Sequence, residues 1–201
     1  MFQRWIGICP GTIPLEYIES NGAQYIDTGF KPNQNTTVIM EYMMPGRNNS
    51  GFFTIFARNG AWGQGGASFS EAFQADGIYR SDFGTSFIEG GSISNAFFGN
   101  KLILEKNKNH TVLRNGGTRL IDIIHSDSNF QLNSNMVFPS GSATIKIYSF
   151  ELYNNDAIVY QFVPVRRETD NKIGMCDLVS GTFFLNAGTG DFIAGPTINE
   201  Q

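Results

Sequence analysis

Apolar and polar residues alternate over residues 145–152, near the C-terminal end of the chain, with a slip of one position near Ser149. Alternation at every second position is typical of a half-buried strand, and the slip predicts a β-bulge. Residues 154–156 are polar and predict a turn. A second strand is expected over 157–163, ending before Pro164 because proline has no N–H to donate to a ladder. The pattern predicts a β-hairpin.

The same alternation recurs along most of the chain. We expect a hairpin turn at Asn21-Gly22, a three-stranded meander over 101–124, and loops at the glycine-rich segments 59–66 and 84–95. The other predicted strands are 15–18, 24–28, 37–44, 52–58, 68–73, 77–83, 101–106, 110–114, 118–124 and 130–138. Many short strands with tight turns predict an all-β, antiparallel two-sheet sandwich.

The composition fits one such domain. The 201 residues include 23 glycines and 18 phenylalanines, and only 16% are charged. A chain of this length buries roughly 70% of its unfolded surface on folding, enough for a sandwich core. We divide the chain into an N-terminal arm, residues 1–13, and a sandwich domain, residues 14–201. Cys9 and Cys176 could form one bridge, but neither has a C-x-x-C neighbour, and we expect both to be reduced and buried.

The charge pattern excludes a nucleic-acid partner, because the net charge is −4 and no basic stripe is present. Lys101, Lys106 and Lys108 are expected on the solvated face and turn of a hairpin. The N-terminus lacks the continuous apolar stretch of a secretory signal. The most apolar run, 37–44, is too short to cross a bilayer, so we expect no membrane insertion.

Two stretches carry a family resemblance: EYIESNGAQYIDTGFKP near the N-terminus, and IKIYSFELY followed by KIGMCDLVSGTFFLNAGTGDFIAGP near the C-terminus. They resemble the concanavalin A-like, laminin-G-like jelly-roll modules of gut-bacterial surface proteins and of the virion proteins of their phages. The resemblance covers about residues 15–196. It implies a jelly roll located on a virion or a bacterial surface. Members of this fold bind glycans or proteins, decorate capsids, or hydrolyse polysaccharides, so the site needs its own argument.

The motifs of the expected enzyme classes are missing from the sequence. The E-x-D-x-x-E strand that the resemblance implies for a retaining glycosidase is not present, and neither is a G-x-S-x-G elbow. The only histidines, His110 and His125, lack metal-ligand spacing. We therefore expect a binding module that is not an enzyme.

Glycan binding needs aromatic faces and planar polar groups on a rigid scaffold. Two segments supply them, the 59–66 loop with its flank and the stretch IYRSDFG. An alternative places Tyr79 in the core and pairs Arg80 with Asp82. The candidate ligand-binding residues are Trp62, Arg58, Asn59, Gln64, Tyr79, Arg80 and Asp82. The expected partner is a glycan or a host surface receptor.

The second hypothesis is a structural decoration protein without a glycan ligand. An exposed apolar arm is costly in a free monomer, so it is expected to dock on other virion or surface-protein subunits, or on a second copy in a homo-oligomer. The candidate docking residues are Phe2, Trp5, Ile6 and Ile8.

Calcium is the only cofactor considered, because related laminin-G-like modules often hold one ion at a sandwich rim. Asp122, Asp127 and Asn129 are the candidate oxygen ligands. A hard cation takes six or more oxygens, so ordinary solvated turn residues are the alternative.

Overall fold

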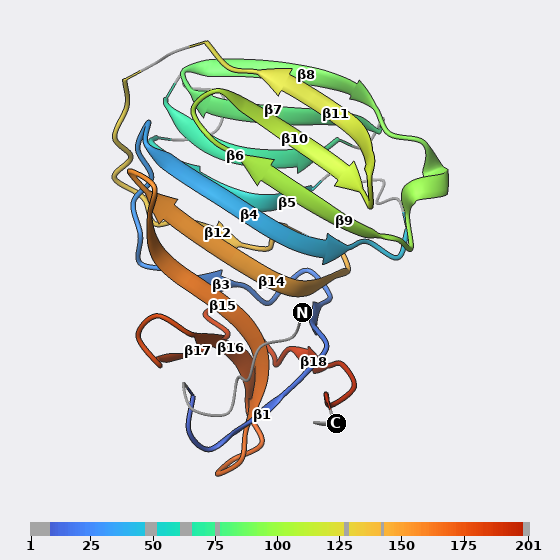
Figure 1. Cartoon of the computed structure of the whole chain (residues 1–201), viewed down its shortest axis with the longest axis vertical. Coiled ribbons are helices and arrows are strands. Elements are labelled where there is room, and N and C mark those ends of the chain that lie inside the picture. Colours follow the sequence, from blue (N-terminus) through green and yellow to red (C-terminus); the bar gives the residue numbers. More distant parts are fainter. Residues whose placement is uncertain are drawn as a thin grey trace.

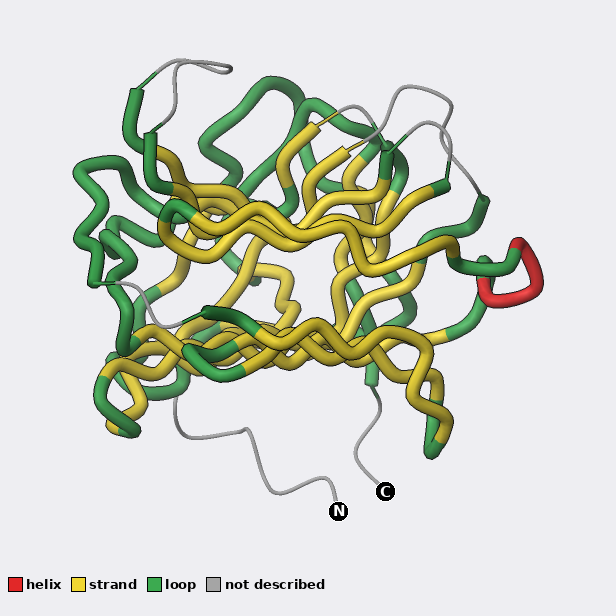
Figure 2. The backbone as a smooth tube through the Cα atoms, turned by 90° about the horizontal axis from the view of Figure 1, so that it is seen from above, coloured by secondary structure: helices red, strands yellow, loops and turns green. Residues whose placement is uncertain are grey.

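The computed structural model describes residues 9–46, 52–60, 66–74, 77–126, 129–141 and 143–198. Two antiparallel sheets lie face to face with the core between them (Figures 1 and 2). Strands β1 to β9 are Thr12–Pro14, Ile18–Ser20, Ile26–Asp27, Thr36–Met43, Phe52–Arg58, Ser68–Phe73, Ile78–Gly84, Ser86–Ser92 and Lys101–Lys106. Strands β10 to β18 are His110–Asn115, Thr118–Ile124, Val137–Phe138, Ser140–Gly141, Ile145–Asn154, Ala157–Arg167, Ile173–Asp177, Phe183–Leu185 and Ile193–Ala194. A 3-10 turn, η1, spans Asn95–Phe97.

The larger sheet runs in the order β11-β10-β9-β4-β14-β15-β16-β17, with β1, β2 and β18 attached to its path. The smaller sheet runs β3-β12-β5-β6-β7-β8, with β13 paired to β5. Each named pair of strands is antiparallel. The chain is an antiparallel jelly-roll sandwich, so the predicted fold class is confirmed.

Alternation along the strands builds the core. On β4, Val38, Met40 and Tyr42 are fully buried, as the period-two pattern predicts. Aromatic rings join the two sheets: Phe138 of the smaller sheet stacks on Phe150 of the larger one, with ring centroids 3.9 Å apart. Burial of such rings is the main favourable contribution to folding.

The C-terminal hairpin and its bulge form as predicted. The register of β14 against β4 shifts between Ile147 and Ser149, and Asn155 and Asp156 make the turn with positive φ angles. The meander of β9, β10 and β11 also forms. These elements depend on neighbours in sequence, which local patterns describe well.

Pro164 contradicts the predicted strand end, because β15 continues through it. On one side of β15, pairing with β14 extends as far as Phe162, and pairing with β1 begins at Val165. Pro164 sits between these two partners, where a missing N–H breaks no ladder bond, and its carbonyl accepts from the Leu15 amide.

Three other expectations were wrong. The strands on either side of Asn21-Gly22 do not form a hairpin, because β2 joins the larger sheet and β3 the smaller one. The expected strand 130–138 is reduced to β12. The expected loop 84–95 contains the edge strand β8, in which Gly90 packs so closely on Ile123 of β11 that a Cβ would lie 2.6 Å from its Cδ1. Close packing therefore requires the glycine that suggested a loop.

The segment before β1 is tied to the sandwich. Cys9 packs with Val163, Val165 and Cys176 in a small apolar cluster apart from the main core. Cys9 and Cys176 form a disulfide with a Cα–Cα separation of 6.4 Å, so the expectation of two reduced cysteines was wrong.

Two consequences follow at the N-terminus. Because β1 pairs with β15, the sandwich includes residues 12 and 13, which the sequence division placed in the arm. The candidate docking residues Phe2, Trp5, Ile6 and Ile8 lie outside the described residues.

In the part of the chain that the structure describes, no helix has the length and apolarity to span a membrane.

The disulfide gives a direct prediction. Thiol titration of the denatured, unreduced protein should find no free thiol, and reduction should release two. Reduction should lower the free energy of unfolding by roughly 2–5 kcal/mol in urea melts, because the bridge closes a long loop. The Cys9→Ser/Cys176→Ser double variant should match the reduced protein. Two reactive thiols in untreated protein would contradict the bridge.

Candidate functional site

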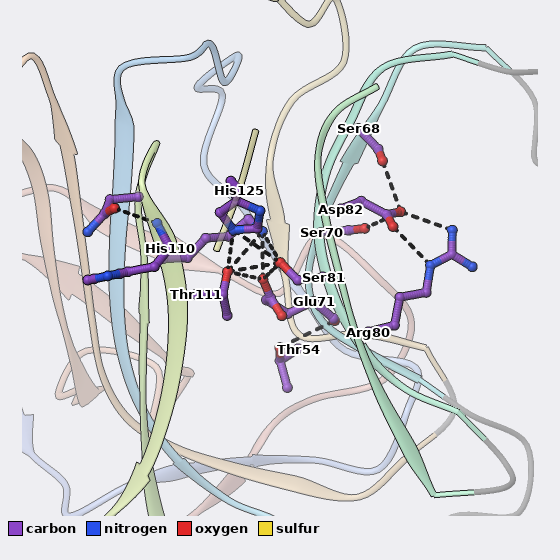
Figure 3. Close-up of polar contacts among 12 residues, drawn as sticks. Thr54, Ser68, Ser70, Glu71, Arg80, Ser81, Asp82, His110, Thr111 and His125 are labelled. Carbon is purple, nitrogen blue, oxygen red and sulfur yellow. Dashed lines mark hydrogen bonds and ion pairs between the residues drawn. The ribbon is translucent and has the colours of Figure 1, made fainter. Parts of the chain in front are cut away.

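Strand β7 places three predicted site residues on two faces of the smaller sheet. Tyr79 is fully buried in the core. Arg80 and Asp82 point to the outer face (Figure 3). Successive residues of a strand face opposite sides, so neighbours in sequence cannot share a site of this kind. The alternative that placed Tyr79 in the core is confirmed, and its ligand-binding role was wrong.

Asp82 holds Arg80 in place. Its carboxylate accepts hydrogen bonds from the hydroxyls of Ser68, at 2.9 Å, and Ser70, at 3.0 Å. It also accepts two bonds from the Arg80 guanidinium, at 2.9 Å from Nε and 3.3 Å from Nη2. Asp82 is only 2% exposed, and such a buried carboxylate is stable only with charged and hydrogen-bonding partners.

An outer-face pocket opens beside this ion pair. It has a volume of about 160 Å³, and its walls include Arg58, Ser68, Arg80, Asp82 and Phe87. The Arg80 guanidinium carbon lies 3.5 Å from the centre of the Phe87 ring. Phe87, on β8, is 51% exposed. Three predicted residues, Arg58, Arg80 and Asp82, are thus brought together, and the sequence analysis missed Phe87 because it lay in an expected loop.

The other predicted ligand residues do not line this pocket in the described part of the chain. Asn59 ties two loops together: its Nδ2 donates to the Gln131 carbonyl at 3.1 Å, and its Oδ1 accepts from the Asn133 amide at 2.7 Å. Trp62 and Gln64 lie outside the described residues, in the segment that leads to the pocket residue Gly66.

Two of the three candidate calcium ligands, Asp122 and Asn129, lie in the described part of the chain. Asp122 is engaged by the Arg119 guanidinium on the same strand, and Asp127 lies outside the described residues. Asn129 is exposed. The described residues contain no group of three or more His, Cys, Asp or Glu side chains that could hold a metal.

A larger cavity of about 290 Å³ lies on the outer face of the larger sheet, against Glu16, Glu41, Lys101 and Tyr148. None of these four residues was among the predicted site residues. The ammonium of Lys101 lies 3.9 Å from the centre of the Tyr148 ring and 3.6 Å from Glu16. Burial, followed by the charge of Glu16, raises the pKa of Tyr148 to about 12. Tyr148 is only 8% exposed, whereas Phe87 is 51% exposed, so less aromatic surface is open to a sugar here than at the outer-face pocket.

A cluster of polar side chains lies between the two sheets, and we call it the core cluster (Figure 3). It consists of Glu71, Ser81, Lys106, Thr111 and His125. Lys106 Nζ and Glu71 Oε1 are 2.6 Å apart, and both side chains are 0% exposed. The expectation that Lys106 lies on a solvated face was wrong. On β9, every second side chain faces the core, and Lys106 follows Leu102 and Leu104 at this spacing.

Hydroxyl groups complete the core cluster. Ser81 Oγ donates to Glu71 Oε1 at 2.6 Å, and Thr111 Oγ1 donates to the same oxygen at 3.0 Å. Thr111 also meets His125 Nε2 at 2.8 Å. Burial, and then the negative charge of Glu71, raises the pKa values of Tyr42 and Tyr79. The ion pair thus joins β6 to β9, and the hydroxyls of Ser81 and Thr111 add β7 and β10 to the same network.

Comparison with known proteins gives distant structural likenesses. No family model matches the chain, and no curated protein matches it significantly. A mutant of Trypanosoma rangeli sialidase displaying trans-sialidase activity is 12% identical, with a TM-score of 0.41 over 62% of this chain. This chain spans 21% of that sialidase. The Ruminococcus gnavus IT-sialidase CBM40 module bound to α2,6-sialyllactose is 14% identical, with a TM-score of 0.42 over 66% of this chain and 89% of that one. These likenesses assign neither ligand nor activity.

Lys106→Met should destabilise the fold strongly, because it leaves the Glu71 carboxylate buried without its cation. We expect the free energy of unfolding in urea to fall by about 3–5 kcal/mol. The Glu71→Leu/Lys106→Met double variant should regain most of that loss. As a control, Lys146→Met removes a more exposed ion pair with Glu19 and should cost less than about 1 kcal/mol. Equal losses in the two single variants would contradict this account.

His125 should make stability depend on pH. Burial, followed by the charges of Lys106 and His110, lowers its pKa from 6.5 to about 3. Because the unfolded chain binds the proton more readily, the stability due to neutral His125 is complete above pH 6.5 and is lost as the pH falls towards 3. Thermal melts should show a smaller midpoint decrease over this range in His125→Gln than in the original protein. Parallel decreases would rule out this role.

Proposed function

We propose that this chain is a non-catalytic carbohydrate-binding module that serves adhesion on a phage virion or a bacterial surface. The glycan lies in the outer-face pocket, against Arg58, Arg80 and Phe87. One observation carries the proposal. Asp82 holds the Arg80 guanidinium by hydrogen bonds, and that guanidinium stacks on the half-exposed ring of Phe87 at the wall of a pocket.

The chemistry of this pocket suits a sugar. A guanidinium presents N–H donors in one plane, which match pairs of sugar oxygens, and an exposed ring face packs on the apolar C–H side of a pyranose. Four hydrogen bonds from three residues fix Asp82, and two of them fix Arg80. A group that is held before binding loses little conformational entropy when the ligand arrives.

The proposal that the module is non-catalytic rests on where reactive side chains lie. Serine, histidine, lysine and glutamate side chains meet in the core cluster, but Lys106 and Glu71 are 0% exposed there. A polysaccharide cannot reach them. The outer-face pocket instead holds an aspartate that is already fully engaged with Arg80, Ser68 and Ser70.

The proposed location rests on two observations. The sequence resembles modules of phage virions and gut-bacterial surfaces, and the Cys9–Cys176 disulfide is of a kind that persists in oxidising surroundings outside the cytosol.

Phe87→Ala tests the pocket. On a glycan array the original protein should retain a defined set of glycans, and Phe87→Ala should weaken that binding roughly five- to tenfold, because loss of an aromatic stacking face removes about 1–1.5 kcal/mol. Its thermal midpoint should change little, since Phe87 is half exposed. Val179→Ala is the matched control, because Val179 is 50% exposed and lies in another part of the sandwich. The Trp62→Ala variant is measured in the same array, because the sequence predicted Trp62 as a ligand-binding residue.

The outcomes separate the two hypotheses. Specific binding that Phe87→Ala leaves unchanged would place the glycan elsewhere, and loss in Trp62→Ala alone would favour the 59–66 loop. A blank array with folded protein would favour the structural decoration role, for which the Cys9 anchor of the arm is the supporting observation. That role is then tested by removing residues 1–8, which keeps Cys9 in place, and by measuring binding to partner subunits and self-association.

A further inference from the structure

The core cluster brings a nucleophile, an electrophile and proton-carrying groups into contact, sealed from solvent. Lys106 Nζ lies 2.6 Å from Glu71 Oε1 and 2.6 Å from Ser81 Oγ. Ser81 Oγ in turn donates to the same Glu71 oxygen at 2.6 Å. The side chains of Lys106 and Glu71 are both 0% exposed. No external substrate can enter, so any chemistry here takes place between these side chains.

The geometry points to an intramolecular amide bond between Lys106 Nζ and the Glu71 carboxyl carbon, which cross-links β9 of the larger sheet to β6 of the smaller one. A buried ion pair carries a large desolvation cost, and condensation removes both charges. The reacting groups are held in contact by two sheets, an arrangement that gives effective concentrations of about 10⁵–10⁸ M in well-oriented systems.

The reaction balances without an oxidant, reductant or cofactor. The Lys106 ammonium transfers one proton to the Glu71 carboxylate, which gives a neutral amine and a neutral acid. The amine lone pair attacks the carboxyl carbon and forms the N–C bond. The C–Oε1 bond then breaks, and Oε1 takes up a second proton from nitrogen and leaves as water. One amide and one water replace one amine and one acid.

The surrounding groups fit these steps. Burial lowers the pKa of Lys106, which favours the neutral amine that attacks. Ser81 accepts from Lys106 and donates to Oε1, so it can relay the proton to the leaving oxygen. Thr111, which contacts His125, donates to Oε1 as well. Glu71 Oε2, which has no hydrogen-bond partner among the described residues, becomes the amide oxygen.

Apolar and aromatic packing protects the product. Lys106 Nζ lies 5.0 Å from the centre of the Phe69 ring and 5.7 Å from that of Phe83. A dry site of this kind keeps water from hydrolysing the amide. The cross-link would hold the two sheets together under mechanical load, and it does not depend on which ligand the outer-face pocket binds.

Intact mass spectrometry of the denatured, reduced protein tests the inference. The original protein should weigh about 18 Da less than its sequence requires, the mass of one water lost in forming an acyl bond. The Lys106→Arg variant keeps the positive charge but has no primary amine, and it should show its full sequence mass. Comparing the two cancels any N-terminal processing. An unmodified mass for the original protein would overturn the inference, whatever the variant does.

Peptide mapping locates the bond. Trypsin should yield peptide 59–80 joined to peptide 102–108, with no cleavage after Lys106. Lys101 and Lys146, which form more exposed ion pairs with Glu16 and Glu19, are internal controls and should be cleaved normally. A mass loss that maps elsewhere, for example to an ester between Glu71 and Thr111 that joins peptide 59–80 to 109–114, would also overturn the Lys106 assignment.

Discussion

The contact between Lys106 and Glu71 is the constraint on which the arrangement of the sandwich depends. It joins the two sheets at 2.6 Å in surroundings from which water is excluded. A buried charge without its partner costs several kcal/mol, so the fold tolerates only alignments in which the two side chains meet. Those alignments fix β6 and β7 relative to β9 and β10, and the hydroxyls of Ser81 and Thr111 complete the network.

The sequence predicted the elements that depend on local patterns. The bulge at Ser149, the turn after β14 and the alternation of Val38, Met40 and Tyr42 follow from the spacing of apolar residues alone. The errors concern long-range pairing. Pro164 does not end β15, because the neighbouring strand changes from β14 to β1 at that point. Gly90 of β8 reflects close packing on β11. No local pattern contains these partners.

The candidate site was predicted in part, for a similar reason. Arg80 and Asp82 were predicted as ligand-binding residues, with their pairing to each other as the alternative, and the structure brings them together with Arg58 at one pocket. Tyr79 was included although strand alternation places it on the opposite face. The core cluster was missed because lysine and glutamate are rarely buried. The signal was nonetheless present: Lys106 follows Leu102 and Leu104 at the same spacing, and Glu71 stands between Phe69 and Phe73.

The core cluster and the outer-face pocket lie on opposite faces of the strand pair β6 and β7. In the register of β6 against β7, Glu71 faces Ser81, so Ser70 must face Asp82 on the other side. A slip of one residue would exchange the faces and place Arg80 and Asp82 in the core. The core cluster disfavours that slip, because the slip would move the Ser81 hydroxyl away from Glu71 and Lys106 and would bury another charged pair. A substitution in the core can therefore disrupt the outer-face pocket by changing the register, although the substituted residue does not line that pocket.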